Sequence, residues 1–286
     1  MIEFHDFTAI AWNIRGAMQS KSQRHVSDLI HSFSPTLFVV LEPQIQFERL
    51  RIFFLRNGYY PIHIQECMGR AGGIWTLGRL GTPFSFSLFR IHDRMTTINI
   101  TRNGNTVHFT SVYANPNSTL RVHDWKCLVE ISRDISGPWL AMGDWNDTVD
   151  ESESVGNRYR PCDHSAFRDV LIDCDLQTIY STGAGFTWKW GVVRCPLIQK
   201  RLDRAVASTT WINSLPVSVV EILPRRCSDH TPIFVKCFQN LGGSGIRPFR
   251  WELAWNTHSD YKYFVDSAWH HSPGNISQRL DNVKEA

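Results

Sequence analysis

The first part of the chain contains two patterns of apolar and polar residues. Continuous apolar runs of strand length alternate with segments in which apolar side chains recur every three or four residues. Residues 7–12 and 37–41 therefore read as buried strands, and residues 22–33 and 47–56 as helices. This β-α-β-α opening predicts a sheet with helices packed on a face.

Residues 59–113 lack helical spacing and contain only short strand-like runs. We place these strands at 60–65, 73–77, 84–90, 96–101 and 106–113. The last two are joined by Asn103-Gly104, a dipeptide that favours a tight hairpin. An antiparallel section thus follows the α/β opening.

Helices and strands alternate again after residue 118. Helical spacing marks 119–133 and 164–173, apolar runs mark strands at 139–143, 201–206, 217–223 and 233–238, and 150–160 and 183–190 read as connections. About ten strands and four helices predict one α/β domain over residues 1–239. A Gly- and Ser-rich linker at 240–248 then leads to a tail, 249–286, whose aromatic residues recur at helical spacing.

Composition and charge narrow the class of protein. The chain has 286 residues, 42% apolar content and a net charge of +3, which is ordinary for a globular protein and compatible with a polyanionic partner. Its seven cysteines never form a Cys-x-x-Cys pair, which favours free thiols in a reducing compartment. No signal-peptide pattern and no apolar run of about 20 residues is present. We therefore expect an intracellular, nuclear or cytoplasmic protein that is neither secreted nor membrane-bound, with a monomer as the default state.

Polar side chains stand where the predicted strands end. They are Asn13, Glu42, Tyr113, Asp144 with Asn146, and Asp229 with His230. Open α/β sheets collect ligands at the carboxyl ends of their strands, so these groups are candidates for one site. The last pair precedes its strand and reaches the same rim only if that strand runs antiparallel.

The segment after the strand at 139–143 has two interpretations. If it stays extended, Asp144 and Asn146 point to the same side and form a small polar site. Alternatively, the two residues simply mark a turn. Gly143, which precedes them, allows a close approach of another backbone.

Asp203 lies inside a predicted strand, where an unpaired carboxylate would cost several kcal/mol. It needs a partner, and His230 is the natural candidate. The other candidate ligands are oxygen donors without the Cys or His spacing of a zinc site, which points to Mg²⁺ or Mn²⁺.

Six ordered motifs resemble the endonuclease/exonuclease/phosphatase superfamily, and more narrowly the apurinic-type endonuclease domain of plant LINE-type (non-LTR) retrotransposons. They are Trp12-Asn13, Leu41-Glu42, Val112-Tyr113-Ala114-x-Pro116, Gly143-Asp144-x-Asn146, Arg201-Leu202-Asp203 and Ser228-Asp229-His230. Further likeness lies in Phe186-Thr187-Trp188, in Arg121 and in the aromatic tail, which is similar to a connector before a reverse transcriptase. The sequence departs from the pattern at Pro43-Gln44 and at Trp145.

The resemblance implies a fold and a metal. The fold is a four-layer α/β-sandwich, with two mixed sheets face to face and helices outside. The metal is Mg²⁺ or Mn²⁺, held by Glu42 with help from Asn13 and Asp229.

The resemblance also implies catalytic roles in phosphodiester hydrolysis. Asp144 is the base or positioner of the attacking water, with Asn146 fixing it. His230, oriented by Asp203, contacts the scissile phosphate, and Tyr113 supports the developing charge. Whether Asp144 or His230 removes the proton stays open.

Basic and aromatic residues near the motifs suit DNA as the partner. Arg201 and Arg204 could bind phosphates and Trp188 could stack on a base, although core or solvated roles are equally compatible with each residue alone. We expect a metal-dependent endonuclease of a retrotransposon-derived protein, with a reverse transcriptase region outside this chain as a further partner. The alternatives are a small-molecule or lipid phosphoesterase on the same fold and a non-catalytic nucleic-acid-binding remnant.

Overall fold

The computed structural model describes residues 3–67, 69, 72–156, 165–191, 198–238, 266, 267 and 269. The chain divides into two compact units, Met1–Asn240 and Leu241–Ala286. The predicted linker at 240–248 lies outside the described residues. So does almost all of the predicted tail, so that its helical character stays a prediction. Within the described part, no helix is long and apolar enough to span a bilayer.

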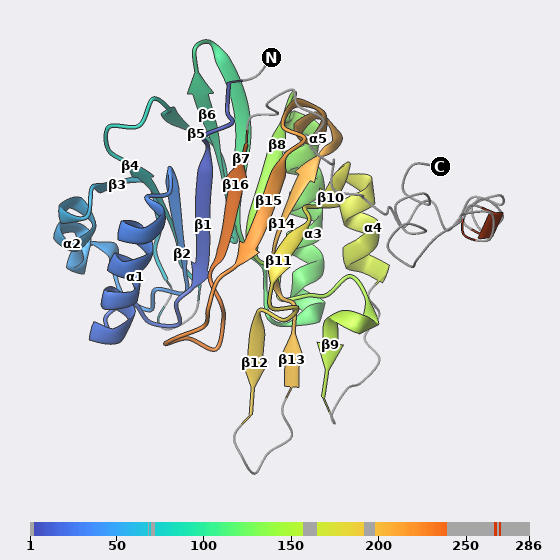
Figure 1. Cartoon of the computed structure of the whole chain (residues 1–286). Coiled ribbons are helices and arrows are strands. Elements are labelled where there is room, and N and C mark those ends of the chain that lie inside the picture. Colours follow the sequence, from blue (N-terminus) through green and yellow to red (C-terminus); the bar gives the residue numbers. More distant parts are fainter. Residues whose placement is uncertain are drawn as a thin grey trace. The chain divides into compact units, whose positions relative to one another are not determined.

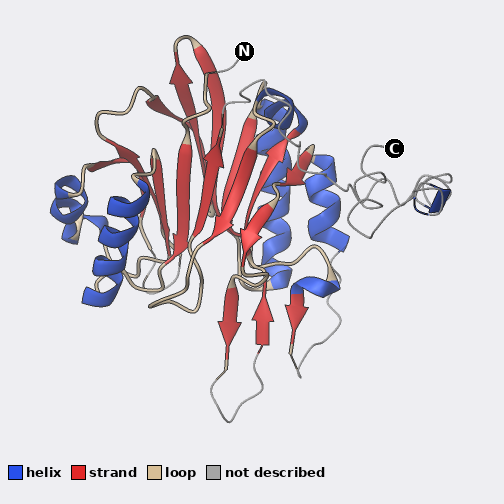
Figure 2. Cartoon of the chain, in the orientation of Figure 1, coloured by secondary structure: helices blue, strands red, loops and turns tan. Residues whose placement is uncertain are grey.

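Two mixed β-sheets form the centre of the first unit (Figures 1 and 2). The first sheet has the order β11-β15-β16-β1-β2-β4-β3. Its strands, in that order, are Ser181–Gly183, Ser218–Ile222, Ile233–Cys237, Thr8–Asn13, Leu37–Leu41, Ile74–Arg79 and Tyr59–Gln65. The second sheet has the order β10-β14-β8-β7-β6-β5. Its strands are Leu176–Thr178, Asp203–Ser208, Trp139–Asp144, Asn105–Tyr113, Met95–Arg102 and Ser85–His92.

Helices cover the outer face of each sheet, which confirms the four-layer α/β-sandwich (Figure 2). Helices α1 (Ser20–Phe33) and α2 (Arg51–Arg56) pack on the first sheet. Helices α3 (Ser118–Asp134) and α4 (Ser165–Asp173) pack on the second. A short helix α5 covers Thr209–Ser214, and 3₁₀ turns form at Phe47–Arg49 and Glu151–Glu153.

Alternation along the strands explains the layers. In β1, Ala9 and Ala11 face the core between the sheets, while Ile10 and Trp12 face the outer core beneath α1. In β8, Leu140 faces the central core and Ala141 packs in the outer core with α3 and α4. Strands buried on both faces read as continuous apolar runs, which is why these strands were predictable.

A third sheet of three short strands was not predicted. Strands β12 (Trp188–Trp190), β13 (Ile198–Lys200) and β9 (Ser154–Val155) lie in the order β12-β13-β9 and extend from the lower end of the sandwich in Figure 1. The sequence assigned 183–190 and 150–160 to connections. Segments of two or three residues carry no periodicity, and only tertiary pairing makes them strands.

The predicted helix at 47–56 is also corrected. Leu50 adopts φ −119° and ψ 5°, which separates the 3₁₀ turn at Phe47–Arg49 from α2. The Phe47 N–H donates to the Glu66 carboxylate at 2.9 Å, so the first turn is fixed by a side chain outside the helix. The apolar spacing of Phe47, Leu50 and Phe54 was real, because all three pack in the outer core beneath α1 and α2.

Candidate active site

Strand pairing brings the predicted polar residues to one end of the sandwich. In the first sheet, β1 and β2 run parallel with Asn13 opposite Leu41, so Glu42 follows directly. In the second, β7 and β8 run parallel with Tyr113 opposite Asp144. Strand β14 runs antiparallel to β8 and places Asp203 opposite Asp144.

The segment before β16 reaches the same end, as the antiparallel pairing of β16 with β1 requires. Ser228 Oγ donates to the Asn13 carbonyl at 2.7 Å and accepts the His230 N–H at 3.1 Å. The Trp12 indole N–H donates to the His230 carbonyl at 3.3 Å. These bonds fix Asp229 and His230 beside the end of β1.

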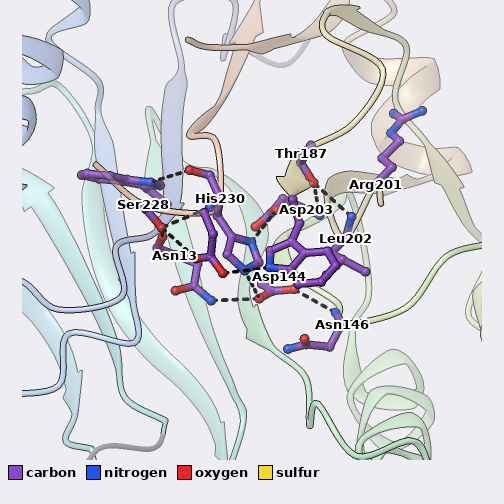
Figure 3. A network of polar contacts seen from close by, with 12 residues as sticks. Asn13, Asp144, Asn146, Thr187, Arg201, Leu202, Asp203, Ser228 and His230 are labelled. Carbon is purple, nitrogen blue, oxygen red and sulfur yellow. Dashed lines mark hydrogen bonds and ion pairs between the residues drawn. The ribbon is translucent and has the colours of Figure 1, made fainter. Parts of the chain in front are cut away.

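Asn13 joins the two sheets. Its Nδ2 donates to Asp144 Oδ2 at 2.9 Å (Figure 3). The same Nδ2 donates to Glu42 Oε1 at 2.9 Å, and the three side chains are buried. The Tyr113 hydroxyl donates to the same Glu42 oxygen at 2.7 Å. Burial, followed by the charge of Glu42, raises the pKa of Tyr113, so this phenol stays a donor. Four predicted residues thus form one hydrogen-bonded group.

His230 lies between two buried carboxylates. Its Nδ1 is 2.9 Å from Asp203 Oδ2, and its Nε2 is 3.7 Å from Asp144 Oδ2 (Figure 3). The Nε2 is buried and has no hydrogen-bond partner among the described residues. This nitrogen is therefore the atom available to a substrate or a water. The predicted pairing of Asp203 with His230 is confirmed.

The electrostatics of this group favour a positively charged imidazole. Burial pulls the pKa of His230 down, but Asp203, Asp144 and Asp229 outweigh it and raise the pKa to about 9. Burial raises the pKa of Asp144 to about 7, although the positive charge of His230 opposes the shift. A cation beside a carboxyl that titrates near neutral pH is typical of proton-transfer sites.

Asn146 follows the turn interpretation and not the extended one. Its φ is +49°, and its N–H donates to Asp144 Oδ1 at 2.9 Å, which closes a turn directly after β8. Its side-chain amide donates to the Ala114 carbonyl at 2.8 Å. Asn146 therefore orients Asp144 through its backbone and braces the loop after β7. Of the two interpretations of this segment, the structure has the turn.

Arg15 is a site residue that the sequence did not single out, and Thr187, which the sequence marked only as part of Phe186-Thr187-Trp188, has a role that was not predicted. Arg15 Nε lies 3.7 Å from Glu42 Oε2 and 3.3 Å from Asp229 Oδ1, in a left-handed conformation with φ +47°. Thr187 Oγ1 accepts the backbone N–H of Asp203 at 2.9 Å and so aligns the start of β14. No motif spacing marks either role, because both depend on contacts across the fold.

The three residues predicted to contact nucleic acid, Trp188, Arg201 and Arg204, differ in their exposure and in their contacts. The Trp188 indole N–H donates to Asp229 Oδ2 at 2.9 Å, so this residue touches the site. Arg201 is partly exposed and donates to Ser181 Oγ at 2.9 Å. Arg204 is a correction, since only 1% of it is exposed and its guanidinium pairs with both oxygens of Glu153 at 3.1 and 2.6 Å. It is a structural ion pair and not a phosphate contact.

Comparisons with known proteins agree with this geometry. The model of the endonuclease/exonuclease/phosphatase family matches residues 10–230. No curated protein matches the chain. The endonuclease domain of TRAS1, a telomere-specific non-LTR retrotransposon, is similar in structure, with a TM-score of 0.60, 10% identity, and coverage of 82% of this chain and 99% of that one.

Two further solved structures are similar. The AP endonuclease LMAP from Leishmania major has a TM-score of 0.64 at 13% identity and covers 84% of this chain and 90% of its own. The 3'-5' exonuclease NExo from Neisseria meningitidis has a TM-score of 0.61 at 17% identity, and the match covers 82% of this chain and 100% of that one. At these identities the likeness is one of fold.

Proposed function

The chain belongs to the endonuclease/exonuclease/phosphatase family, and on that premise we propose that it is a divalent-metal-dependent phosphodiesterase that nicks DNA. The observation that carries the proposal is the buried hydrogen-bonded group in which Asn13 links Glu42 to Asp144 while His230 stands between Asp144 and Asp203. Buried carboxylates in such number are costly unless they serve a charged ligand or a reaction.

The donors near Glu42 fit a hard divalent cation. Glu42 and Asp229 present carboxylate oxygens to the same position, where the Arg15 guanidinium supplies positive charge in this structure. Together with Asn13 they would hold Mg²⁺ or Mn²⁺ through oxygen atoms alone. When bound, such an ion would withdraw charge from a phosphate oxygen.

His230 and Asp144 would divide the remaining chemistry. A protonated His230, held by Asp203 at Nδ1, would direct its Nε2 proton at a phosphate oxygen and stabilise developing negative charge. Asp144, oriented by Asn13 and by the Asn146 N–H, would accept the proton of the attacking water. Tyr113 and Asn13 would keep Glu42 in place by donating to it.

The short three-stranded sheet supports DNA as the substrate. Its strand β12 begins at Trp188, which contacts Asp229, and continues to Lys189 and to Trp190, which is half exposed. The paired strand β13 adds Lys200. Partly exposed basic and aromatic side chains beside a phosphodiesterase site suit a long polyanion better than a small ester.

The finer assignment is to a retrotransposon-derived protein. It rests on the ordered motifs that resemble LINE-type endonucleases and on the fold shared with the TRAS1 domain. In this assignment the chain would open one strand of target DNA for an element's integration.

Supercoiled plasmid and a small ester, bis(p-nitrophenyl) phosphate, together test the proposed function. We expect the purified chain to convert plasmid to open circles with Mg²⁺ and not with EDTA. Hydrolysis of the small ester without nicking would favour the small-molecule phosphoesterase. Plasmid binding without hydrolysis of either substrate would favour the non-catalytic remnant.

A further inference from the structure

A second cluster of metal-ligating side chains shares no residue with the candidate active site and lies at the edge of the second sheet. His92 is the last residue of the edge strand β5, and Cys127 and Glu130 lie on α3. One ligand atom from each residue lies within 4.8 Å of the others. A fourth donor is adjacent, because His123 Nε2 is 3.7 Å from Cys127 Sγ.

The secondary structure accounts for this convergence. His123, Cys127 and Glu130 are spaced by four and three residues along α3, which places them on one face of the helix. Arg90 of β5 donates to the Glu130 carbonyl at 3.4 Å and pairs with Asp134, which holds the edge strand against the helix. His92 pairs with Met95 at the tip of the β5–β6 hairpin, so its side chain is fixed at the end of the strand.

His92 supplies the observation that points to a missing ligand. Its Nε2 is buried and has no hydrogen-bond partner among the described residues. A buried imidazole nitrogen left without a partner is destabilising, and a bound cation would offset that loss. His25 and His108 also have buried nitrogens without partners, yet neither belongs to a cluster of three or more potential ligands in the part of the chain that the structure describes.

The chemistry of the donors selects the ion. Two imidazoles, one thiol and one carboxylate are the borderline and soft donors that Zn²⁺ takes in four-coordinate sites. Mg²⁺ and Ca²⁺ prefer oxygen alone and would not use Cys127. Metal–ligand bonds of about 2.0–2.3 Å require His92, Cys127 and Glu130 to draw together by roughly 1 Å, and His123 to turn toward them. The side chains of His123 and Glu130 are exposed and free to make that adjustment.

We propose that His92, His123, Cys127 and Glu130 form a structural zinc site that fastens α3 to the β5–β6 hairpin. The inference does not depend on the proposed nuclease activity. A zinc ion at this position would also help to fix the active-site end, because α3 holds the loop that follows β7. Asp124 accepts the Asn115 N–H at 2.6 Å, and Arg121 donates to the Asn115 carbonyl at 2.7 Å and pairs with Asp147 at 3.1 Å.

Calorimetric titration of Zn²⁺ into the whole, EDTA-treated and desalted chain tests the site. Excess Mg²⁺ in the buffer would occupy oxygen-donor sites. We expect one equivalent of zinc to bind and to raise the melting temperature. His92→Gln and Cys127→Ser should each weaken binding by about a hundredfold or more, whereas Cys174→Ser, at another buried free thiol, should not.

Cobalt gives a readout specific to the thiolate. Co²⁺ in the same site should produce a thiolate-to-metal charge-transfer band that Cys127→Ser abolishes and Cys174→Ser retains. Glu130→Gln, at an exposed position that cannot threaten folding, should weaken Zn²⁺ binding as well. Absence of zinc binding by the wild-type chain, or binding undiminished by either His92→Gln or Cys127→Ser, would overturn the proposal.

Discussion

Asp203 illustrates what can be deduced about a single residue before its structure is known. A carboxylate inside an apolar strand needs a partner, and His230, the candidate that the motifs offered, is 2.9 Å from Asp203 in the structure. The place of Arg15 could not be deduced, because its contacts with Glu42 and Asp229 depend on a left-handed backbone that no residue type there specifies. The sequence could not decide between a turn and an extended segment at Asn146, because a turn and a strand end share the same short sequence.

Substitutions of His230 and Asp203 test the catalytic pair. His230→Gln removes the cation, and Asp203→Asn removes the charge that orients it, so each should lower the nicking rate on the order of a hundredfold or more. His108→Gln is the matched control, since His108 is also buried but lies near the other end of β7. Plasmid nicking assays with circular dichroism on the same samples measure both effects. Full activity of the His230→Gln chain would remove the imidazole from the mechanism.

The raised pKa of His230 predicts a pH-dependent stability of the metal-free protein. A folded-state pKa of about 9, above the ordinary value of 6.5, means that folding favours the protonated imidazole. Its stabilisation is complete below about pH 6.5 and is lost as the pH rises through 9, by a few kcal/mol. The raised pKa of Asp144 also makes the free energy of unfolding fall as the pH rises, but at lower pH, up to about 7.

Urea unfolding in EDTA measures this loss. Between about pH 6.5 and 9 the wild-type free energy of unfolding should fall, while that of His230→Gln should change much less. Parallel pH profiles for the two chains would mean that His230 is not protonated in the folded protein.

At the scale of elements, length decided what the sequence could predict. Strands β2 and β7, with five and nine residues, are buried on at least one face and bounded by turn residues, and their predicted limits agree with the structure to within a residue. Strands β10 and β13 and helix α5 are three to six residues long, and contacts with the rest of the fold define them. Thr187, which aligns Asp203, lies just before another such short strand, β12, and its role could not be predicted for the same reason.

Gly143 tests how tightly the site depends on strand packing. A Cβ at this position would lie 2.0 Å from the Val112 carbonyl oxygen, so β7 and β8 could not keep their separation. Gly143→Ala should destabilise the fold by about 2–4 kcal/mol and displace Asp144 from Tyr113. Gly58→Ala is the control, because Gly58 also has a positive φ but open space around its Cα. Equal melting temperatures for the two variants would contradict the close approach.

At the scale of the whole molecule, the two sheets are what make the site. Glu42 and Asp229 adjoin strands of one sheet, whereas Asp144 and Asp203 lie on the other, and Asn13 bridges them. Neither sheet alone holds both the candidate metal ligands and the two carboxylates that flank His230. The layered fold was predictable from alternating apolar runs, but this bridge was not, because nothing local to Asn13 specifies a contact with residue 144.

Metal-dependent nicking by the wild-type chain and by Glu42→Gln tests whether the carboxylate of Glu42 holds a catalytic cation. Glu42→Gln keeps the shape of the side chain, which could still accept from Asn13 and Tyr113, but removes the charge that would hold the cation. The account predicts Mg²⁺-dependent open circles with wild type and a rate lower by about a hundredfold or more with Glu42→Gln, at unchanged DNA binding. A wild-type chain that binds DNA yet nicks it no faster than Glu42→Gln would contradict the account.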